Sequence, residues 1–581
     1  MSGRDPRFGL LRPVCPVIGS VIGLITGASL VAIAAGCSRA TPKVPAPAAQ
    51  SPAATATGSV QSRTQAGRPT AATQGMREQL LAGMVAVLAE LDRYDEVRAS
   101  EQVFDRLVQW SYAARPAEWQ PDPLVATLPP DLRAAGADVL ERSTFDGFGD
   151  INAIRDRVWL ADIARTARGG GVDELEAATR LFQWTIRWLA AVSDPPMVPS
   201  QAVPGSRWFS PGEILLAGRG SPGQRAWIFL ELLRQAEIDG VMLATPGRGN
   251  GQPRPWIPAA IINGEAYLFE PTYGLPIPGP GGAGVATVRQ AIRDPAILAA
   301  LSLPDRPYPV QAADLKQVVV LVAADPGSLS PRMTRLEAEL APSRGVHVAI
   351  DASALARRAQ ATLPADEPVE PSLWTFPWES LARRPLAAAA LADELGPLTV
   401  PLPAGNSRNP GQTMRPLFVG RLREFRGDLE GPAGAKAAYL AARPSRRAVA
   451  AAVAALPQDQ AAAATRGLVR MKEDATYWLG LLTLSEGQFE AAIDYLGRMT
   501  LEASPDSRWT DAARVNLAAA LVELGRVGEA ATLLEEDGSP QRFGSRLLAR
   551  RIDRPVGLEE ESAHELEPHE LEPEPLARER E

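Results

Sequence analysis

The pattern of apolar and polar positions is clearest between residues 171 and 305, where it predicts two helices followed by three strands. Apolar residues recur every three or four positions up to Leu189 and again from Gln224 to Ala236, which is the spacing of a helix with one buried face. Three short apolar and β-branched runs predict strands, at Val241–Ala244, Ile257–Ile262 and Ala266–Phe269. Asn263-Gly264 predicts a tight hairpin between the last two, because a type I′ turn needs positive φ at both central residues.

The segments on either side of this region have patterns of their own. Residues 76–170 have helical spacing, and we expect them to form a helical layer against it. Within the otherwise Pro-rich residues 306–415, strand, helix and strand are predicted in the order of a βαβ unit, at Val318–Ala323, Arg332–Leu340 and Val346–Ile350. Residues 430–554 are Ala-rich and predicted to be helical throughout.

Three short motifs in residues 171–305 resemble the transglutaminase-like superfamily, which has a papain-type fold. In that family a Cys opens a helix and is followed by Ala, Phe, Leu and Arg at fixed spacing, and this chain matches those later positions with Ala226, Phe229, Leu232 and Arg234. The family's His-Ala-Trp resembles Arg254-Pro255-Trp256, and its Asp-Pro-Thr resembles Glu270-Pro271-Thr272. The resemblance implies a papain-type core in about a sixth of the chain.

The chain departs from the family at all three catalytic positions. Pro222 stands for the nucleophilic Cys, Arg254 for the His and Glu270 for the Asp. Thiol catalysis needs a thiolate, an imidazole base and a carboxylate that orients the base, and only a carboxylate remains. Ser221 lies beside the nucleophile position but has no base, because no His precedes residue 347. We therefore expect no catalytic residue, with an envelope hydrolase or peptidase using a non-standard site as the alternative.

Arg254 allows two interpretations. A guanidinium in the vestigial cleft is suited to an anionic ligand or a peptide carboxylate, because its planar fork of donors matches such groups. A salt bridge between Arg254 and Glu270 is the interpretation that we favour, which would make both residues structural.

Two stretches of the C-terminal part resemble tetratricopeptide repeats. The small and apolar residues at the pattern positions are Leu479, Gly480, Gly487, Ala492 and Leu496 in the first, and Leu517, Ala518, Leu521, Gly525, Ala530 and Leu534 in the second. The spacing from Gly487 to Gly525 is 38 residues, against about 34 in the family, and we expect the loop near Ser504–Trp509 to hold the excess. The resemblance implies a groove for a protein or peptide partner. An ordinary helical bundle is the alternative.

The N-terminus has the features of a bacterial lipoprotein signal peptide at residues 1–36. Basic residues precede an apolar run that ends Ala34-Ala35-Gly36-Cys37, which resembles a lipobox with Cys37 as the lipid attachment site. An uncleaved membrane anchor is the alternative. Residues 37–75 are rich in Ala, Pro, Ser and Thr and are expected to form a disordered tether. Both alternatives place the chain in the cell envelope outside the cytoplasm, and Ser38 favours the outer membrane of a diderm bacterium.

Composition and charge narrow the possible functions. The tail at residues 555–581 carries ten Glu and two Arg, a charge of −8. The whole chain also has a net charge of −8, so the rest of the chain is neutral and no nucleic-acid partner is implied. His564 and His569 in this tail form at most a weak metal site. Gly218, Gly220 and Gly223 fit a dinucleotide motif, but no acidic residue ends the next strand, so we expect neither a cofactor nor a metal.

These patterns together predict an α+β transglutaminase-like core with an α/β extension, followed by an all-α tetratricopeptide-like module. Because the triad is degenerate, the expected function is binding or scaffolding. The expected partners are the membrane, through the lipid, and a protein or peptide at the helical repeats. A purely structural envelope component is a third hypothesis.

Overall fold

The structure is a computed structural model that describes residues 71–112, 119–170, 173–193, 207–247, 253–364, 369–403, 413–454 and 456–552. It combines helices with a sheet, as an α+β chain does, with 63% helix and 10% strand. The predicted signal peptide, Cys37, most of the tether and the acidic tail with its two His lie outside the described residues. In the part of the chain that is described, no helix has the length and apolar character needed to cross a bilayer.

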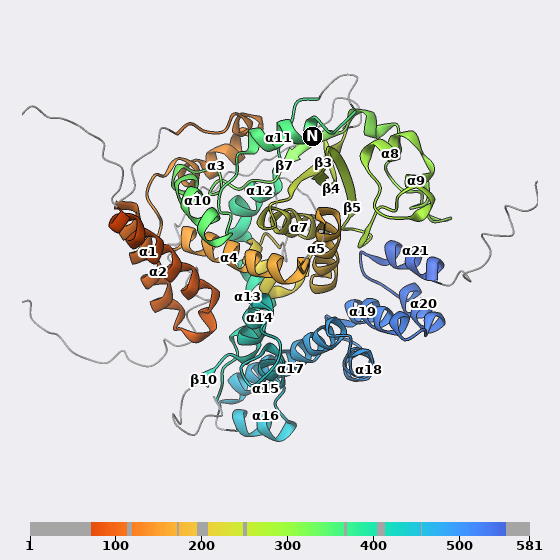
Figure 1. Ribbon diagram of the computed structural model, residues 1–581. Coiled ribbons are helices and arrows are strands. Elements are labelled where there is room, and N and C mark those ends of the chain that lie inside the picture. Colours follow the sequence, from red (N-terminus) through yellow and green to blue (C-terminus); the bar gives the residue numbers. More distant parts are fainter. Residues whose placement is uncertain are drawn as a thin grey trace, which may run out of the picture. The chain divides into compact units, whose positions relative to one another are not determined.

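A six-stranded sheet in the order β6-β5-β4-β3-β7-β8 forms the centre of the α+β region (Figure 1). Its strands are β3 (Asp239–Thr245), β4 (Arg254–Ile262), β5 (Glu265–Glu270), β6 (Leu275–Pro276), β7 (Val319–Val322) and β8 (Ser372–Leu373). All neighbours are antiparallel except β7 and β8. The predicted hairpin is confirmed, because Ile262 pairs with Glu265 and the turn residues Asn263 and Gly264 have φ values of 51° and 76°.

Helices cover both faces of the sheet, as the alternation of its side chains requires. Met242, Ala260 and Phe269 point to one face, where the rings of Phe182 and Phe229 pack on Phe269. The helices of this face are α5 (Glu174–Trp188) and α7 (Pro222–Gln235). The opposite face packs against α8 (Val288–Arg293), α9 (Ala296–Ala299) and α11 (Ala352–Gln360).

Four α-helices lie in the described part of the predicted N-terminal helical region. They are α1 (Ala71–Ala89), α2 (Glu96–Tyr112), α3 (Pro130–Glu141) and α4 (Gly149–Arg168). Helix α4 is largely buried and contacts α5, α6 (Pro211–Ala217), α7 and α14 (Pro416–Arg426). Because α4 packs against α7, this region reaches the core as the sequence predicted.

The predicted strand at Val346–Ile350 is wrong. The helix before it is present as α10 (Pro331–Arg344), but β7 pairs instead with the two-residue strand β8. Side chains take the backbone N–H groups of the segment, since the Glu337 carboxylate accepts from Val348 and Ala349 at 2.6 and 3.0 Å. The side chain of Gln235 holds both backbone groups of His347 in the same way. The apolar residues of this segment are therefore buried without a strand partner.

The C-terminal part consists almost entirely of helices. These are α12 (Phe376–Arg383), α13 (Ala388–Thr399), α14, α15 (Ala435–Ala441), α16 (Arg446–Val453), α17 (Gln458–Ser485), α18 (Phe489–Ile493), η6 (Asp494–Glu502), α19 (Thr510–Glu523), α20 (Val527–Glu535) and α21 (Arg542–Ile552). Gly487 and Gly525, at φ 72° and 73°, make equivalent turns between α17 and α18 and between α19 and α20. In both turns the residue after the glycine donates its N–H to a carbonyl five residues back. The two predicted units are thus two helical hairpins with the same turn.

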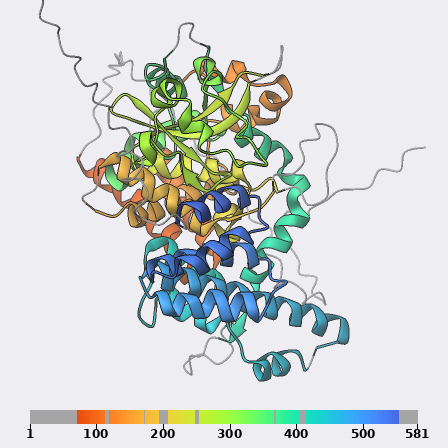
Figure 2. The same cartoon turned by 90° about the vertical axis from the view of Figure 1, so that its right-hand side faces the viewer.

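The helical hairpins pack directly on the α+β core. Trp478 of α17 stacks on Trp188 of α5, with ring centroids 6.0 Å apart, and it also lies against Gly218. At the other end, Gly544 of α21 touches the backbone of Tyr273 just after β5. Figure 2 shows the C-terminal helices, in blue, against the α+β region. One buried apolar cluster consequently runs from α1 to α21. The close approach of Trp478 explains the first glycine of the motif, Gly218.

A glycine substitution tests this packing. A Cβ on Gly218, which has φ 62°, would lie 2.0 Å from the Trp478 ring, whereas a Cβ on Gly264, with φ 76°, would meet nothing within 4 Å. Gly264→Ala should cost about 1–2 kcal/mol, from backbone strain alone. Gly218→Ala should cost about 1–3 kcal/mol more, because it also overpacks the contact. Urea unfolding of both variants measures the difference, and equal losses would contradict the close contact with Trp478.

Candidate functional site

Ser221 and Pro222 lie at the start of helix α7, where Ser221 is buried and Pro222 is half-buried. Pro222 is the first residue of that helix, and Ser221 is its N-cap. The Ser221 hydroxyl accepts the backbone N–H of Gln224, and the Gln224 side chain accepts the N–H of Ser221 in return, which makes a capping box. Ser221 has an exposed fraction of 0%. Its hydroxyl therefore acts as a helix cap rather than as an accessible nucleophile.

The carboxylate position is buried and hydrogen-bonded. Glu270, at the end of β5, is 4% exposed. One of its carboxylate oxygens accepts the hydroxyl of Tyr308 at 2.5 Å, and the other accepts the backbone N–H of Thr272 at 2.9 Å. The indole N–H of Trp256 donates in turn to the Tyr308 oxygen at 2.9 Å. Burial raises the pKa of Glu270, while the hydrogen bonds from Tyr308 and Thr272 oppose the shift.

The expected salt bridge between Arg254 and Glu270 is absent. Arg254 is the exposed first residue of β4 and pairs through its backbone with Thr245 of β3. Glu270 pairs through its backbone with Leu275 of β6, and its buried carboxylate accepts hydrogen bonds from Tyr308 and Thr272. Arg254 is exposed instead, so Pro222, Arg254 and Glu270 do not form one polar site.

Arg225 occupies the space behind the start of α7 and was not singled out from the sequence. Its side chain is 2% exposed and donates to the carbonyl oxygens of Leu189 and Pro271 and to the side-chain oxygen of Gln541. Burial lowers its pKa to about 10. The Gln541 contact comes from the segment before α21. Arg225 and Gln541 therefore form a buried polar contact beside the start of α7.

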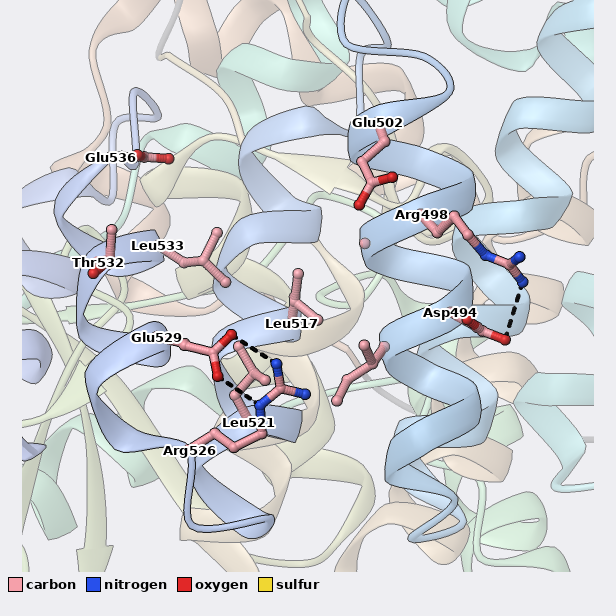
Figure 3. A pocket seen from close by; sticks show the side chains of 12 residues that line it. Asp494, Arg498, Glu502, Leu517, Leu521, Arg526, Glu529, Thr532, Leu533 and Glu536 are labelled. Atoms are coloured by element: carbon pink, nitrogen blue, oxygen red, sulfur yellow. Dashed lines mark hydrogen bonds and ion pairs between the residues drawn. The ribbon is translucent and has the colours of Figure 1, made fainter.

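A concave groove of about 550 Å³ lies between η6, α19 and α20 (Figure 3). Its floor is apolar and consists of Ile493, Gly497, Leu517, Leu521 and Leu533. One wall is η6, with Asp494, Arg498 and Glu502 along it, and the other is α20 with its preceding turn, with Arg526, Glu529, Thr532 and Glu536. Both predicted repeat units contribute to this groove, Leu517 and Leu521 being among the pattern positions.

The η6 wall is a π-helix, in which backbone hydrogen bonds join residues five apart. The N–H of Ala503 donates to the carbonyl of Arg498 at 3.2 Å, and the hydroxyl of Thr500 donates to the carbonyl of Tyr495 at 2.8 Å. The wider turn aligns side chains that lie four residues apart, and here it presents Asp494, Arg498 and Glu502 along one wall. Such π segments are rare and are frequently found at functional sites.

The charges of the groove are partly neutralised within each wall. On α20, Arg526 donates two hydrogen bonds to Glu529, at 2.7 and 2.6 Å. On η6, Arg498 forms an ion pair with Asp494 at 3.2 Å. Glu502 has no ion-pair partner among the described residues. Glu536 has only a long contact of 3.9 Å with Arg514, which pairs more closely with Asp511.

The metal-ligating residue types do not converge elsewhere in the described ranges. No group of three or more His, Cys, Asp and Glu side chains is arranged there to hold a metal ion. The single described His, His347, donates its Nδ1–H to the Glu337 carboxylate at 2.8 Å in the segment after α10. Its role there is to hold that segment on the core.

The raised pKa of Glu270 predicts a pH effect on stability. Because the folded chain binds this proton more tightly than the unfolded chain, stability falls as the pH rises from about 4.5 through the raised pKa. The loss of stability amounts to about 1.4 kcal/mol for each unit by which the pKa of Glu270 is raised, and the Glu270→Gln variant does not show it. In urea unfolding, the free energy of unfolding of Glu270→Gln relative to the unmodified chain should therefore increase as the pH is raised from about 4.5 to about 8. The exposed control Glu535→Gln should show no such trend, and a pH-independent difference for Glu270→Gln would contradict the buried position.

No protein-family model, curated protein or solved structure matches this chain. The resemblance of its core and of its helical hairpins to known families accordingly rests on the sequence motifs alone. The function has to be inferred from the geometry and chemistry of the chain itself.

Proposed function

We propose that this chain is a binding or scaffold protein of the bacterial cell envelope, whose recognition surface is the groove between η6, α19 and α20. The groove carries the proposal, because it combines an apolar floor, charged walls and a volume of about 550 Å³. Concave sites with apolar linings and a few polar groups are where proteins usually hold ligands. Its size is suited to a few side chains of a peptide or of a protein partner.

In this proposal the α+β region is a transglutaminase-like domain without its triad, and the hairpins are tetratricopeptide-like units that extend it. The burial of Ser221 and Glu270 supports a structural role for that region, since a substrate would reach neither side chain. The polar contacts of Arg225 and Glu270 support the same role. The core would then serve to hold the helical hairpins.

In this proposal a lipid on Cys37 anchors the chain to the extracytoplasmic face of a membrane. The basic residues, apolar run and small residues that precede Cys37 support it. The outer membrane is favoured by Ser38. Replacing Cys37 by Ala should abolish incorporation of a radiolabelled fatty acid into the chain, and labelling of the variant at the level of the unmodified chain would argue against lipid attachment.

Site-specific crosslinking in cells tests the recognition surface. A photoreactive amino acid at Thr532, which lines the groove and is exposed, should yield a discrete adduct. The same amino acid at Glu523, exposed on α19 and not part of the lining, is the matched control. A single adduct from Thr532 and none from Glu523 is expected, identified by mass spectrometry. Equal adducts from both positions, or none from Thr532, would contradict recognition in the groove.

A further inference from the structure

The groove is chemically different at its two ends. At one end, Asp494 and Arg498 form a pair within η6, and Arg526 and Glu529 form a pair beside α20, so that this end is neutral. At the other end lie Glu502 and Glu536 (Figure 3). Neither carboxylate has a close cationic partner among the described side chains. The lining as a whole has four carboxylates and two guanidinium groups.

The backbone adds to the negative charge of this second end. Glu502 is the last residue of η6, and Glu536 is the C-cap of α20. A helix carries a partial negative charge at its C-terminus, from carbonyl groups without intrahelical partners. Two such termini and two carboxylates thus lie at one end of a groove with low-dielectric walls, which strengthens their field. A cation is attracted there and an anion is repelled.

The floor adds a second requirement. Leu517 and Leu521 are already buried, at 7% and 3% exposed, whereas Leu533 is half-buried. An occupant therefore gains apolar burial mainly on Leu533, and it must present an apolar side chain there. The charged walls interact with the residues that flank this apolar side chain in the occupant. They thereby determine the orientation in which the occupant binds.

From this charge complementarity we infer that the groove binds a cationic, amphipathic peptide segment, with an apolar side chain on the Leu517–Leu521–Leu533 floor and Lys or Arg at the Glu502–Glu536 end. The inference rests on the proposed function and specifies the partner of the same groove. It also fixes a direction, since the neutral end offers no unpaired charge to a basic residue. A partner segment with acidic residues beside the apolar one is excluded by the same field.

Three terminally blocked peptide pools test the inference with the full-length chain. Each pool contains Leu-Leu flanked by randomised neutral residues, followed by Arg-Arg, Gln-Gln or Glu-Glu. Fluorescence anisotropy should show that the Arg-Arg pool binds at least about tenfold more tightly than the Glu-Glu pool at low salt, with the Gln-Gln pool between them. The preference should shrink as ionic strength rises, because exposed charges are screened.

A charge-reversal variant assigns the preference to this end of the groove. Glu502→Lys with Glu536→Lys should abolish or invert the ranking of the pools. Glu490→Lys with Glu535→Lys changes the net charge equally, at exposed positions outside the lining, and should leave the ranking unchanged. Circular dichroism checks that both double variants keep their helices. An unchanged ranking in the groove variant would overturn the inference.

The outcomes also separate this inference from the proposed function. Equal binding of all pools, or tighter binding of the Glu-Glu pool, would overturn the cationic partner. Crosslinking from Thr532 would in that case still support recognition in the groove. Binding of no pool at millimolar peptide would overturn the inference too, and the proposed function would then stand or fall on the crosslinking at Thr532 and Glu523.

Discussion

The burial of Arg225 is the constraint on which the arrangement of this chain depends. A guanidinium removed from water must recover its hydrogen bonds from the protein, or the cost of burial is several kcal/mol. Here the acceptors come from three separate segments: Leu189 at the end of α5, Pro271 after β5, and Gln541 before α21. The carbonyl of Leu189 lies at a helix C-terminus, where a cation is favoured. The segment between α20 and α21, which follows the second helical hairpin, therefore completes a polar site that begins inside the α+β core.

This shared site and the apolar contact of Trp478 with Trp188 hold the hairpins at two points. The groove lies between those points along the chain, in η6, α19 and α20. A binding surface held in this way is pre-organised, which reduces the entropy that a ligand must lose. In the proposed function the core would thus contribute to recognition without contacting the ligand, by holding the helices that form the groove.

Much of the local structure follows from sequence patterns, whereas the polar contacts between distant segments do not. The hairpin at Asn263-Gly264 is predicted by two residues that tolerate positive φ, and the helix beginning at Pro222 is predicted by its apolar spacing. The segment at Val346–Ile350 has strand-like composition, but the side chains of Gln235 and Glu337 replace its strand partner. No local pattern contains that information, because the two side chains come from other elements.

The candidate site shows the same division. The glycines at 487 and 525 predict two helical hairpins, and the groove between hairpins follows from them. The sequence patterns do not predict the π-helix at Asp494–Glu502. They place the extra residues of the 38-residue spacing in the loop near Ser504–Trp509, which follows this helix. Arg225 reads in the sequence as an ordinary helix residue. The expected salt bridge of Arg254 with Glu270 is wrong, because Arg254 is exposed while Glu270 is buried and hydrogen-bonded to Tyr308 and Thr272.

The central claim is that the core and the helical hairpins form one cooperative unit that holds the groove in shape. Native-state hydrogen exchange in increasing urea, followed by mass spectrometry of peptides from α7, α17 and α20, measures this directly. If Arg225 and Trp478 join the two parts, the three helices lose their protection at the same urea concentration. Loss of protection in α17 and α20 at a concentration where α7 stays protected would contradict the account.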